Sequence, residues 1–400
     1  MLIEILIFLL LGILAGSITG ILPGIHINLV GSILLSSTFF LTLHINPFYS
    51  VTFIVSMSIA HTFIDFIPSI YLGAPDEDSV LTVLPGHRLL LEGRAHEAVL
   101  ITLIGSLLAI TTILALSPLL ITFIPKLSAA VQFFIPYLLI LVSIFLILTE
   151  KNKFLGLFIF VLASFLGLSA LNLPLKDPLL PILTGLFGAS SLILSIKQKI
   201  KIPQQEIPLL REIKIPKKDF AFPVFFSTIF SSLLGFLPTL GSSQIATISS
   251  TIKKQNERQF LFSIGLINTF LMILSFITIF TIDKARTGSA VFIQTLLNEI
   301  SLQQLIFILS ICFASSILSF ILAIKISKIF AKNIEKINYT KISFLILIFL
   351  SIIVIIFSGM IGFIIFVTST FLGLTSNLMG VKRTNLIACL LVPTIVLYLF

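Results

Sequence analysis

Tryptophan is absent from this 400-residue chain, cysteine occurs only twice, and charged residues make up only 10% of it. A soluble domain carries about 25% charged residues, so this shortage excludes a soluble enzyme, a nucleic-acid-binding protein and a disordered chain. Cys312 and Cys389 both lie in apolar runs, which predicts small core side chains and no disulfide framework. No nucleic-acid partner is expected.

Apolar residues are what the chain has in excess. They form 57% of the sequence, and the mean hydropathy is +1.19. One membrane-crossing helix needs about 20 of them, so the total is enough for roughly 11 spans. The composition therefore predicts an all-α, polytopic protein of the cell membrane, with the lipid bilayer as its main surroundings.

Proline, glycine and charge divide the apolar positions into segments, several of them too short to span a membrane alone. Two pairs, 1–22 with 27–43 and 220–237 with 240–252, are each interrupted by a Gly/Pro cluster. We therefore expect 10 to 12 transmembrane helices, with these pairs forming broken or re-entrant helices. The predicted segments are 1–22, 27–43, 48–72, 97–124, 128–149, 153–172, 178–196, 220–237, 240–252, 260–282, 302–324, 342–358, 360–379 and 384–400.

The net charge of +9 is concentrated in one place. Seven of the 25 Lys and Arg residues lie in the polar stretch 197–219, and cytoplasmic loops of membrane proteins collect such residues. We predict a first membrane repeat at 1–196, a cytoplasmic basic linker at 197–219 and a second membrane repeat at 220–400.

A short turn motif occurs once in each half. Gly20, Leu22 and Pro23 match Gly235, Leu237 and Pro238 at a fixed offset of 215 positions, and each copy precedes a Ser/Thr-rich segment. The match predicts two structural repeats. Whether they run parallel or inverted stays open at this stage.

Matched helix breaks in two halves indicate a transporter's binding site, because freed backbone groups in lipid must lie inside protein or beside a water-filled cavity. The N-terminus of a half-helix suits a carboxylate or another anion. The alternative is that both turns only kink helices for packing. The substrate-site residues predicted here are Gly20, Pro23, Gly24, His26, Asn28, Gly235, Pro238, Gly241, Ser242, Ser243 and Asn268. Asn268 has a second interpretation, an interhelical hydrogen bond.

Acidic residues are rare in the apolar part, and Asp65 stands out within the run 48–72. A carboxylate at membrane depth usually marks an ion pathway, but Pro68 follows closely and a position near the membrane surface is equally compatible. Asp76 opens an acidic triplet that would either cap the next helix or coordinate a cation. We assign Asp65 and Asp76 to a coupling ion. Lys382 and Arg383 are interpreted as a cytoplasmic anchor, with an anion site as the alternative.

Enzyme signatures are scarce. The sequence contains no H-E-x-x-H, C-x-x-C, Walker A or Rossmann motif, so neither an enzymatic activity nor a cofactor is expected. Two alternatives stay open. One is an intramembrane metal-dependent enzyme that uses His61, Asp65, Asp76 and His87; the other is a channel or scaffold without coupled transport.

The chain resembles the large permease subunit of tripartite tricarboxylate transporters, the TctA family, in its shorter archaeal-type branch. The resemblance covers essentially the whole chain. It rests on the two G-x-L-P turns, on the segments 72–78, 84–88 and 92–94, and on the late Met379-Gly380-Val381-Lys382-Arg383. Through it, Gly73 and Pro75 join the predicted substrate site.

The resemblance implies a secondary transporter with about a dozen helices in two repeats. It further implies a small carboxylate or other organic anion as substrate, moved with a coupling cation, Na⁺ or H⁺. An extracytoplasmic binding protein and a small membrane subunit are the implied partners.

Overall fold

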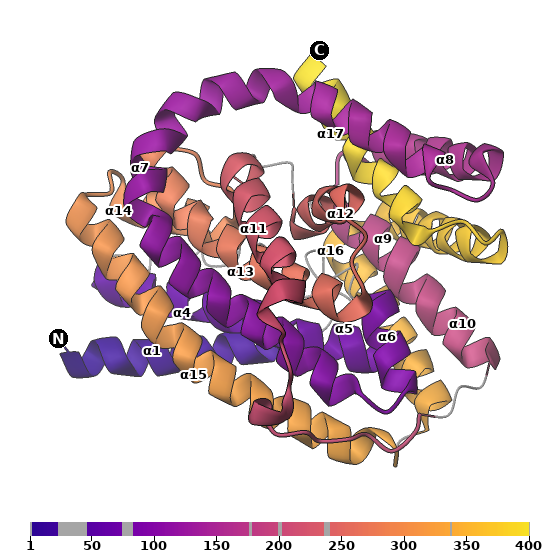
Figure 1. The fold of residues 1–400 in the computed structure, drawn as a ribbon, viewed down its shortest axis with the longest axis horizontal. Helices are drawn as coiled ribbons and strands as arrows, with labels where there is room; N and C mark the ends of the chain where they lie inside the picture. Colours follow the sequence, from indigo (N-terminus) through magenta and orange to yellow (C-terminus); the bar gives the residue numbers. More distant parts are fainter. Residues whose placement is uncertain are drawn as a thin grey trace.

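The computed structural model describes residues 2–22, 46–73, 83–175, 178–198, 202–235, 241–336 and 338–399. Within these ranges every regular element is a helix (Figure 1), and eight helices are long and apolar enough to cross a membrane. Three shorter apolar helical segments comprise Pro136–Leu148, Gly288–Leu297 and Arg383–Leu399. The prediction of an all-α, polytopic membrane protein is confirmed.

Two groups of packed helices make up the described part of the chain, and the first, the main bundle, takes helices from both halves of the sequence. They are α1 (Leu2–Ile21), α4 (Pro47–Ile64), α5 (Phe66–Leu72), α6 (Val83–Leu91), the first part of α7 (Ala95–Leu148), α11 (Lys217–Leu234), α12 (Ser242–Ile252), α13 (Glu257–Ile282), α14 (Gly288–Leu297) and α15 (Leu302–Ile334). Two spans, Pro47–Leu72 and Glu257–Ile282, are each 94% buried and form its centre.

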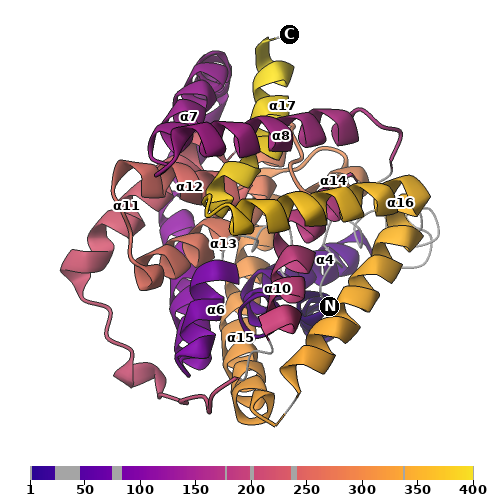
Figure 2. The same ribbon diagram turned by 90° about the vertical axis from the view of Figure 1, so that its right-hand side faces the viewer.

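The second group, the side bundle, packs beside the main bundle (Figure 2). It contains α8 (Lys153–Leu171), α9 (Leu179–Leu183), the π-helix η2 (Thr184–Ala189), α10 (Ser190–Gln198), α16 (Tyr339–Leu378), η4 (Arg383–Ile387) and α17 (Ala388–Leu399). Each group therefore mixes residues from before and after the linker.

Glycines allow α1 to lie directly on α4. A Cβ added at Gly12 would lie 2.4 Å from the Phe53 carbonyl oxygen, and one at Gly16 would lie 2.2 Å from that of Met57. Such close backbone approach is the usual basis of helix association in lipid, where small residues recur every four positions. Because the contacts advance in the same direction along both helices, α1 and α4 run parallel.

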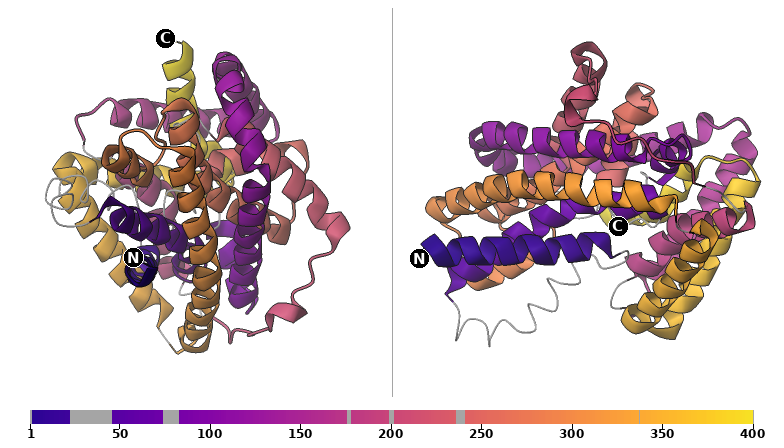
Figure 3. Two further views of the ribbon diagram at one scale, coloured as in Figure 1. Left: turned by 90° about the vertical axis from the view of Figure 1, so that its left-hand side faces the viewer. Right: turned by 90° about the horizontal axis from the view of Figure 1, so that it is seen from below.

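Other contacts set the directions of the main-bundle helices. Ser315 Oγ donates to Ser56 Oγ at 3.0 Å and Phe48 packs edge-on against Phe307, so α15 runs parallel to α4; α15 also lies beside α1 (Figure 3). Ser106 Oγ donates to the Gly265 carbonyl at 3.1 Å, which joins α7 to α13.

Reciprocal glycine contacts join the helices of the side bundle. A Cβ at Gly167 of α8 would meet the Cys389 carbonyl oxygen of α17 at 1.9 Å, and one at Gly373 of α16 would meet that of Leu186 in η2 at 2.2 Å. Cys389 and Cys312 are both free and buried, in agreement with the prediction that they are core residues.

The basic linker is fastened to the turn between α6 and α7. The Gln205 side chain accepts from Ala95 N and donates to the Leu90 carbonyl, each at 3.0 Å, and Glu206 N donates to the Gly93 carbonyl at 2.7 Å. Gly93 has φ +79°, and a Cβ there would clash with Gln204. The division at 197–219 stays a prediction, as do the two repeats.

Candidate functional site

The junction between α4 and α5 carries a buried acid. Asp65 is 2% exposed, and its N–H donates to the His61 carbonyl at 2.9 Å. Pro68 follows three residues later and has no N–H with which to continue the helical bonding pattern, while Ser69 Oγ donates to the Asp65 carbonyl at 2.9 Å. Asp65 therefore lies inside the protein, beside the point where a central helix lacks one backbone hydrogen bond.

The side chain of Asn268 reaches Asp65 from the other half of the chain. Asn268 lies midway along α13, is 3% exposed, and donates from Nδ2 to Asp65 Oδ2 at 3.0 Å. The interhelical hydrogen bond proposed for Asn268 is thus present, and its partner is the acid singled out for a coupling ion.

Further polar contacts lie close to this pair, on α1, α4 and α13. Thr269 Oγ1 donates to Thr62 Oγ1 at 3.4 Å, and Thr19 Oγ1 of α1 lies 3.1 Å from His61 Nδ1. Polar groups of α1, α4 and α13 therefore line one interior strip. Sequence reasoning missed Thr19, Thr62 and Thr269, because an isolated threonine in an apolar helix usually bonds to its own backbone.

The two predicted turn glycines end helices that pack around this strip. A Cβ at Gly20 would lie 3.2 Å from Asp65 N, and one at Gly235 would touch Leu271 and Leu274 of α13, just after Asn268. Arg286 Nη1 also donates to the Gly235 carbonyl. Both turns therefore begin next to the helices that carry the Asp65–Asn268 pair.

The second turn leads into the N-terminus of α12. Gly241 caps this helix with an extended backbone, and Ser242 is its first residue. Ser243 is 4% exposed, and its Oγ forms no hydrogen bond with the described part of the chain. Gly73, with φ +64°, ends α5. The predicted residues Pro23, Gly24, His26, Asn28, Pro75, Asp76 and Pro238 lie outside the described residues.

Charged side chains at the α6–α7 turn belong to a different, more exposed cluster. Arg88 pairs with Glu257, and Glu97 pairs with Arg94 at 2.8 Å and with Arg258 at 3.1 Å. These ion pairs connect residues from before and after the linker. Solvated pairs of this kind contribute about 0–1 kcal/mol each, so they help to position the linker face and do not make a site.

Among the described residues, no three His, Cys, Asp or Glu side chains gather as metal ligands. His61 bonds to Thr19, whereas His87 lies on α6, close to Arg383. This arrangement gives the metal-enzyme alternative no support.

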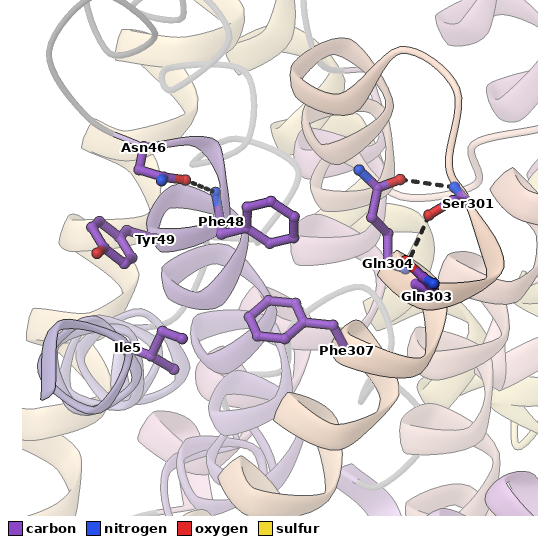
Figure 4. Close-up of a pocket in the computed structure, with 8 residues that line it drawn as sticks. All are labelled: Ile5, Asn46, Phe48, Tyr49, Ser301, Gln303, Gln304 and Phe307. Atoms are coloured by element: carbon purple, nitrogen blue, oxygen red, sulfur yellow. Dashed lines mark hydrogen bonds between the residues drawn. The ribbon is translucent and has the colours of Figure 1, made fainter. Parts of the chain in front are cut away.

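A pocket of about 390 Å³ opens between the starts of α1, α4 and α15 (Figure 4). Three of its polar side chains cap helices: Asn46 Oδ1 accepts from Phe48 N at 3.0 Å, and Ser301 and Gln304 form a capping box at the start of α15. The pocket is therefore a crease between helix caps, and we do not assign the site to it.

Comparison with known proteins covers the whole chain. The Tripartite tricarboxylate transporter TctA family matches residues 6–388. An uncharacterized protein from Methanocaldococcus jannaschii is 30% identical over 414 aligned positions, which cover 98% of this chain and 99% of that protein. No solved structure matches. The chain is thus a multi-pass membrane protein of a transporter family, and it belongs to the TctA family of tripartite tricarboxylate transporters.

Proposed function

We propose that this chain is the permease of a cation-coupled secondary transporter for small carboxylates or related organic anions, and that Asp65 and Asn268 bind the coupling cation. The observation that carries the proposal is a buried carboxylate at a helix junction, hydrogen-bonded to an amide from the opposite half of the chain.

The coupling role follows from the cost of burying charge. An ionised carboxylate in a low-dielectric interior is unstable unless a cation or proton neutralises it. Asn268 Nδ2 donates a hydrogen bond to this carboxylate. The hydroxyl oxygens of Thr62, one turn before Asp65, and of Thr269, directly after Asn268, add neutral oxygen atoms of the type that hard cations prefer.

The substrate role falls to the N-terminus of α12. The positive dipole end of a helix favours an anion, and Ser243 Oγ adds a buried donor that the described residues leave unused. The packing of α12 against α13 supports this proposal, because an anion at the start of α12 and a cation at Asn268 would then be held by neighbouring helices.

The family is tripartite, so an extracytoplasmic binding protein and a small membrane subunit are the expected partners. In this scheme the binding protein delivers the anion, and the permease moves it with Na⁺ or H⁺.

Uptake by reconstituted vesicles tests the proposal. The assay compares a panel of radiolabelled mono-, di- and tricarboxylates with and without Na⁺ and proton gradients. We expect saturable uptake that depends on one gradient. A channel would give flux without saturation, and a scaffold or an enzyme would give none.

Two isosteric or truncating variants then test the pair. Asp65→Asn is expected to abolish gradient dependence, and Asn268→Ala to reduce coupled uptake by about 10- to 100-fold, since a hydrogen bond to a charged group is worth about 1.5–3 kcal/mol. Asp283→Asn and Asn333→Ala are the matched exposed controls. Gradient-dependent uptake that is the same in Asp65→Asn as in the unmodified chain would contradict the assignment.

A further inference from the structure

Arg383 is a buried, positively charged side chain that lies outside the site proposed for the coupling cation. It is the first residue of η4, directly after the turn at Gly380 and Lys382, and it is 5% exposed. Its depth argues against a simple cytoplasmic anchor, because an anchoring arginine keeps its guanidinium in water or among lipid headgroups.

Every hydrogen bond that the guanidinium makes with the described residues goes to a neutral acceptor. Nε donates to Asn377 Oδ1 at 3.1 Å, and Nη1 donates to the Phe187 carbonyl at 3.3 Å and to Ser191 Oγ. Nη2 makes no such bond within the described ranges, and no carboxylate there forms an ion pair with Arg383.

Glu150 is an acid that contacts this turn, but its hydrogen bonds do not go to Arg383. Glu150 Oε1 accepts from Lys382 N at 3.1 Å and from Asn385 Nδ2 at 2.7 Å, so its contacts go to the residues on either side of Arg383. Buried charges in proteins are normally paired, because removing an ion from water costs several kcal/mol. Arg383 therefore lacks the counter-charge that its burial calls for.

The surroundings of the guanidinium are those of a contact between the two helix groups. Phe187 lies in the π-helix η2, and π-turns inside helices occur often at functional sites. From the main bundle, His87 of α6 lies close enough for burial and then the charge of Arg383 to lower its pKa to about 4. His87 is consequently neutral at pH 7 and adds no second positive charge.

We propose that Arg383 anchors an oxyanion-binding site between α6, η2 and η4, and that this site receives a carboxylate group of the transported anion. The unused Nη2 leaves the guanidinium with N–H donors and a full positive charge for one oxygen of a carboxylate, and a hydrogen bond between two charged groups is stronger than a neutral one. The inference rests on the proposed function for the identity of the anion, whereas oxyanion binding itself does not depend on transport.

Equilibrium binding to the purified full-length chain tests the site. Radiolabelled citrate and succinate are the probes, in detergent free of anionic lipid. We expect Arg383→Gln to weaken binding at least about 10-fold and Arg383→Lys to weaken it less, because an ammonium keeps the charge but cannot both hold the neutral acceptors and reach the anion as the larger guanidinium does. Arg211→Gln, at an exposed linker arginine, is the control and keeps the original affinity.

A purely structural role for Arg383 predicts a different pattern. In that case Arg383→Gln lowers the thermal unfolding midpoint without ligand, while Arg383→Lys binds the carboxylates as tightly as the unmodified chain. That result would overturn the inference. If Arg383→Gln does not fold, the Arg383→Lys affinity still decides the question.

A measurement on the unmodified chain avoids the variants altogether. Binding of a carboxylate beside Arg383 would offset the positive charge near His87, so citrate is expected to raise the pKa of the His87 imidazole. The shift is followed by NMR of ¹⁵N-histidine-labelled protein, with His87→Gln to assign the signal. An unchanged His87 titration at saturating citrate would count against the site.

Two further measurements, competition by phosphatidylglycerol and uptake by vesicles, distinguish a transported carboxylate from a lipid headgroup as the source of the oxyanion. If phosphatidylglycerol competes with citrate at Arg383, and citrate binds only in its absence, the site is a lipid-headgroup site and the substrate assignment is wrong. If vesicles take up no carboxylate, the proposed function fails while Arg383-dependent binding can still hold. If uptake occurs equally with Arg383→Gln, only the present inference fails.

Discussion

Serine and threonine hydroxyls inside these helices mostly bond to a carbonyl one turn earlier, as Ser164 does to Phe160 and Thr247 to Ser243. Such bonds satisfy the hydroxyl within its own helix. Asp65 with Asn268 and His61 with Thr19 differ, because their bonds cross between helices. Polar contacts that cross helices fix relative helix positions, and a transporter must break and remake some of them as it moves.

His87 gives a prediction for pH dependence. Burial, and then the charge of Arg383, lower its pKa in the folded chain to about 4, below about 6.5 in an unfolded chain. Above pH 6.5 His87 is neutral in both the folded and the unfolded chain, so its titration lowers the free energy of unfolding only below that pH. As pH falls from 6.5 towards 4, the unfolded state takes up the proton first, so stability is lost at up to about 1.4 kcal/mol per pH unit.

The measurement is the thermal unfolding midpoint between pH 7 and pH 4.5, for the unmodified chain and for His87→Gln. We expect the unmodified chain to lose more stability on acidification than the variant. Identical pH profiles would show that His87 does not contribute.

The sequence singled out residues whose chemistry is rare in apolar segments, and their roles stay predictions. An acid in an apolar run and an amide at the centre of another were conspicuous, and the structure joins them. Arg383 was interpreted as an anchor because burial depends on which helices pack around it, and a local sequence window does not contain that information. Thr19 escaped notice for the same reason.

At the scale of the helix, the interruptions predicted at glycine and at proline have different outcomes. The predicted gap between 342–358 and 360–379 falls at Gly359, which has φ +65° and ψ −167° inside α16. The gap predicted between 124 and 128 did not end a helix, since α7 continues through Pro118, Pro125 and Pro136. Proline bends a helix when neighbouring groups satisfy the freed carbonyls, whereas a backbone conformation reserved for glycine breaks it.

Gly359→Ala is expected to destabilise the protein by about 1–3 kcal/mol, because its backbone region is almost exclusive to glycine. An added Cβ would meet nothing within 4 Å, so the cost is conformational and not steric. Chemical or thermal unfolding measures it. Ile361→Ala, at a 48% exposed side chain on the same helix, is the control. Equal midpoints for Gly359→Ala and the unmodified chain would mean that α16 straightens without cost.

At the scale of the whole molecule, one helix pair from each half has the same relative direction, while the two repeats themselves stay a prediction. In the first half α1 runs parallel to α4, and in the second α11 runs parallel to α13, since Phe220 packs on Phe262 and Gly235 on Leu271. Yet α4 and α13 run antiparallel, because Asp65 and Thr62 meet Asn268 and Thr269 in reverse order. These directions favour inverted repeats, the alternative that the sequence left open.

Membrane orientation provides the test at this scale. The linker, the α6–α7 turn and the start of α13 share one face, whereas α1, α4 and α15 begin at the other. If basic residues mark the cytoplasm, a membrane-impermeant maleimide added to intact cells labels Gln303→Cys and not Lys214→Cys. The buried native cysteines give little background. Labelling of Lys214→Cys but not of Gln303→Cys would show that the chain has the opposite orientation.

The contact between Gly167 and the Cys389 carbonyl has a consequence for biosynthesis. The ribosome completes α8 long before it reaches α17, so the glycine face of α8 must wait in the bilayer without its partner. A ribosome-stalled or truncated chain ending before α17 is therefore expected to retain insertion factors or to be degraded. Packing of α8 in the side bundle therefore waits for the synthesis of α17.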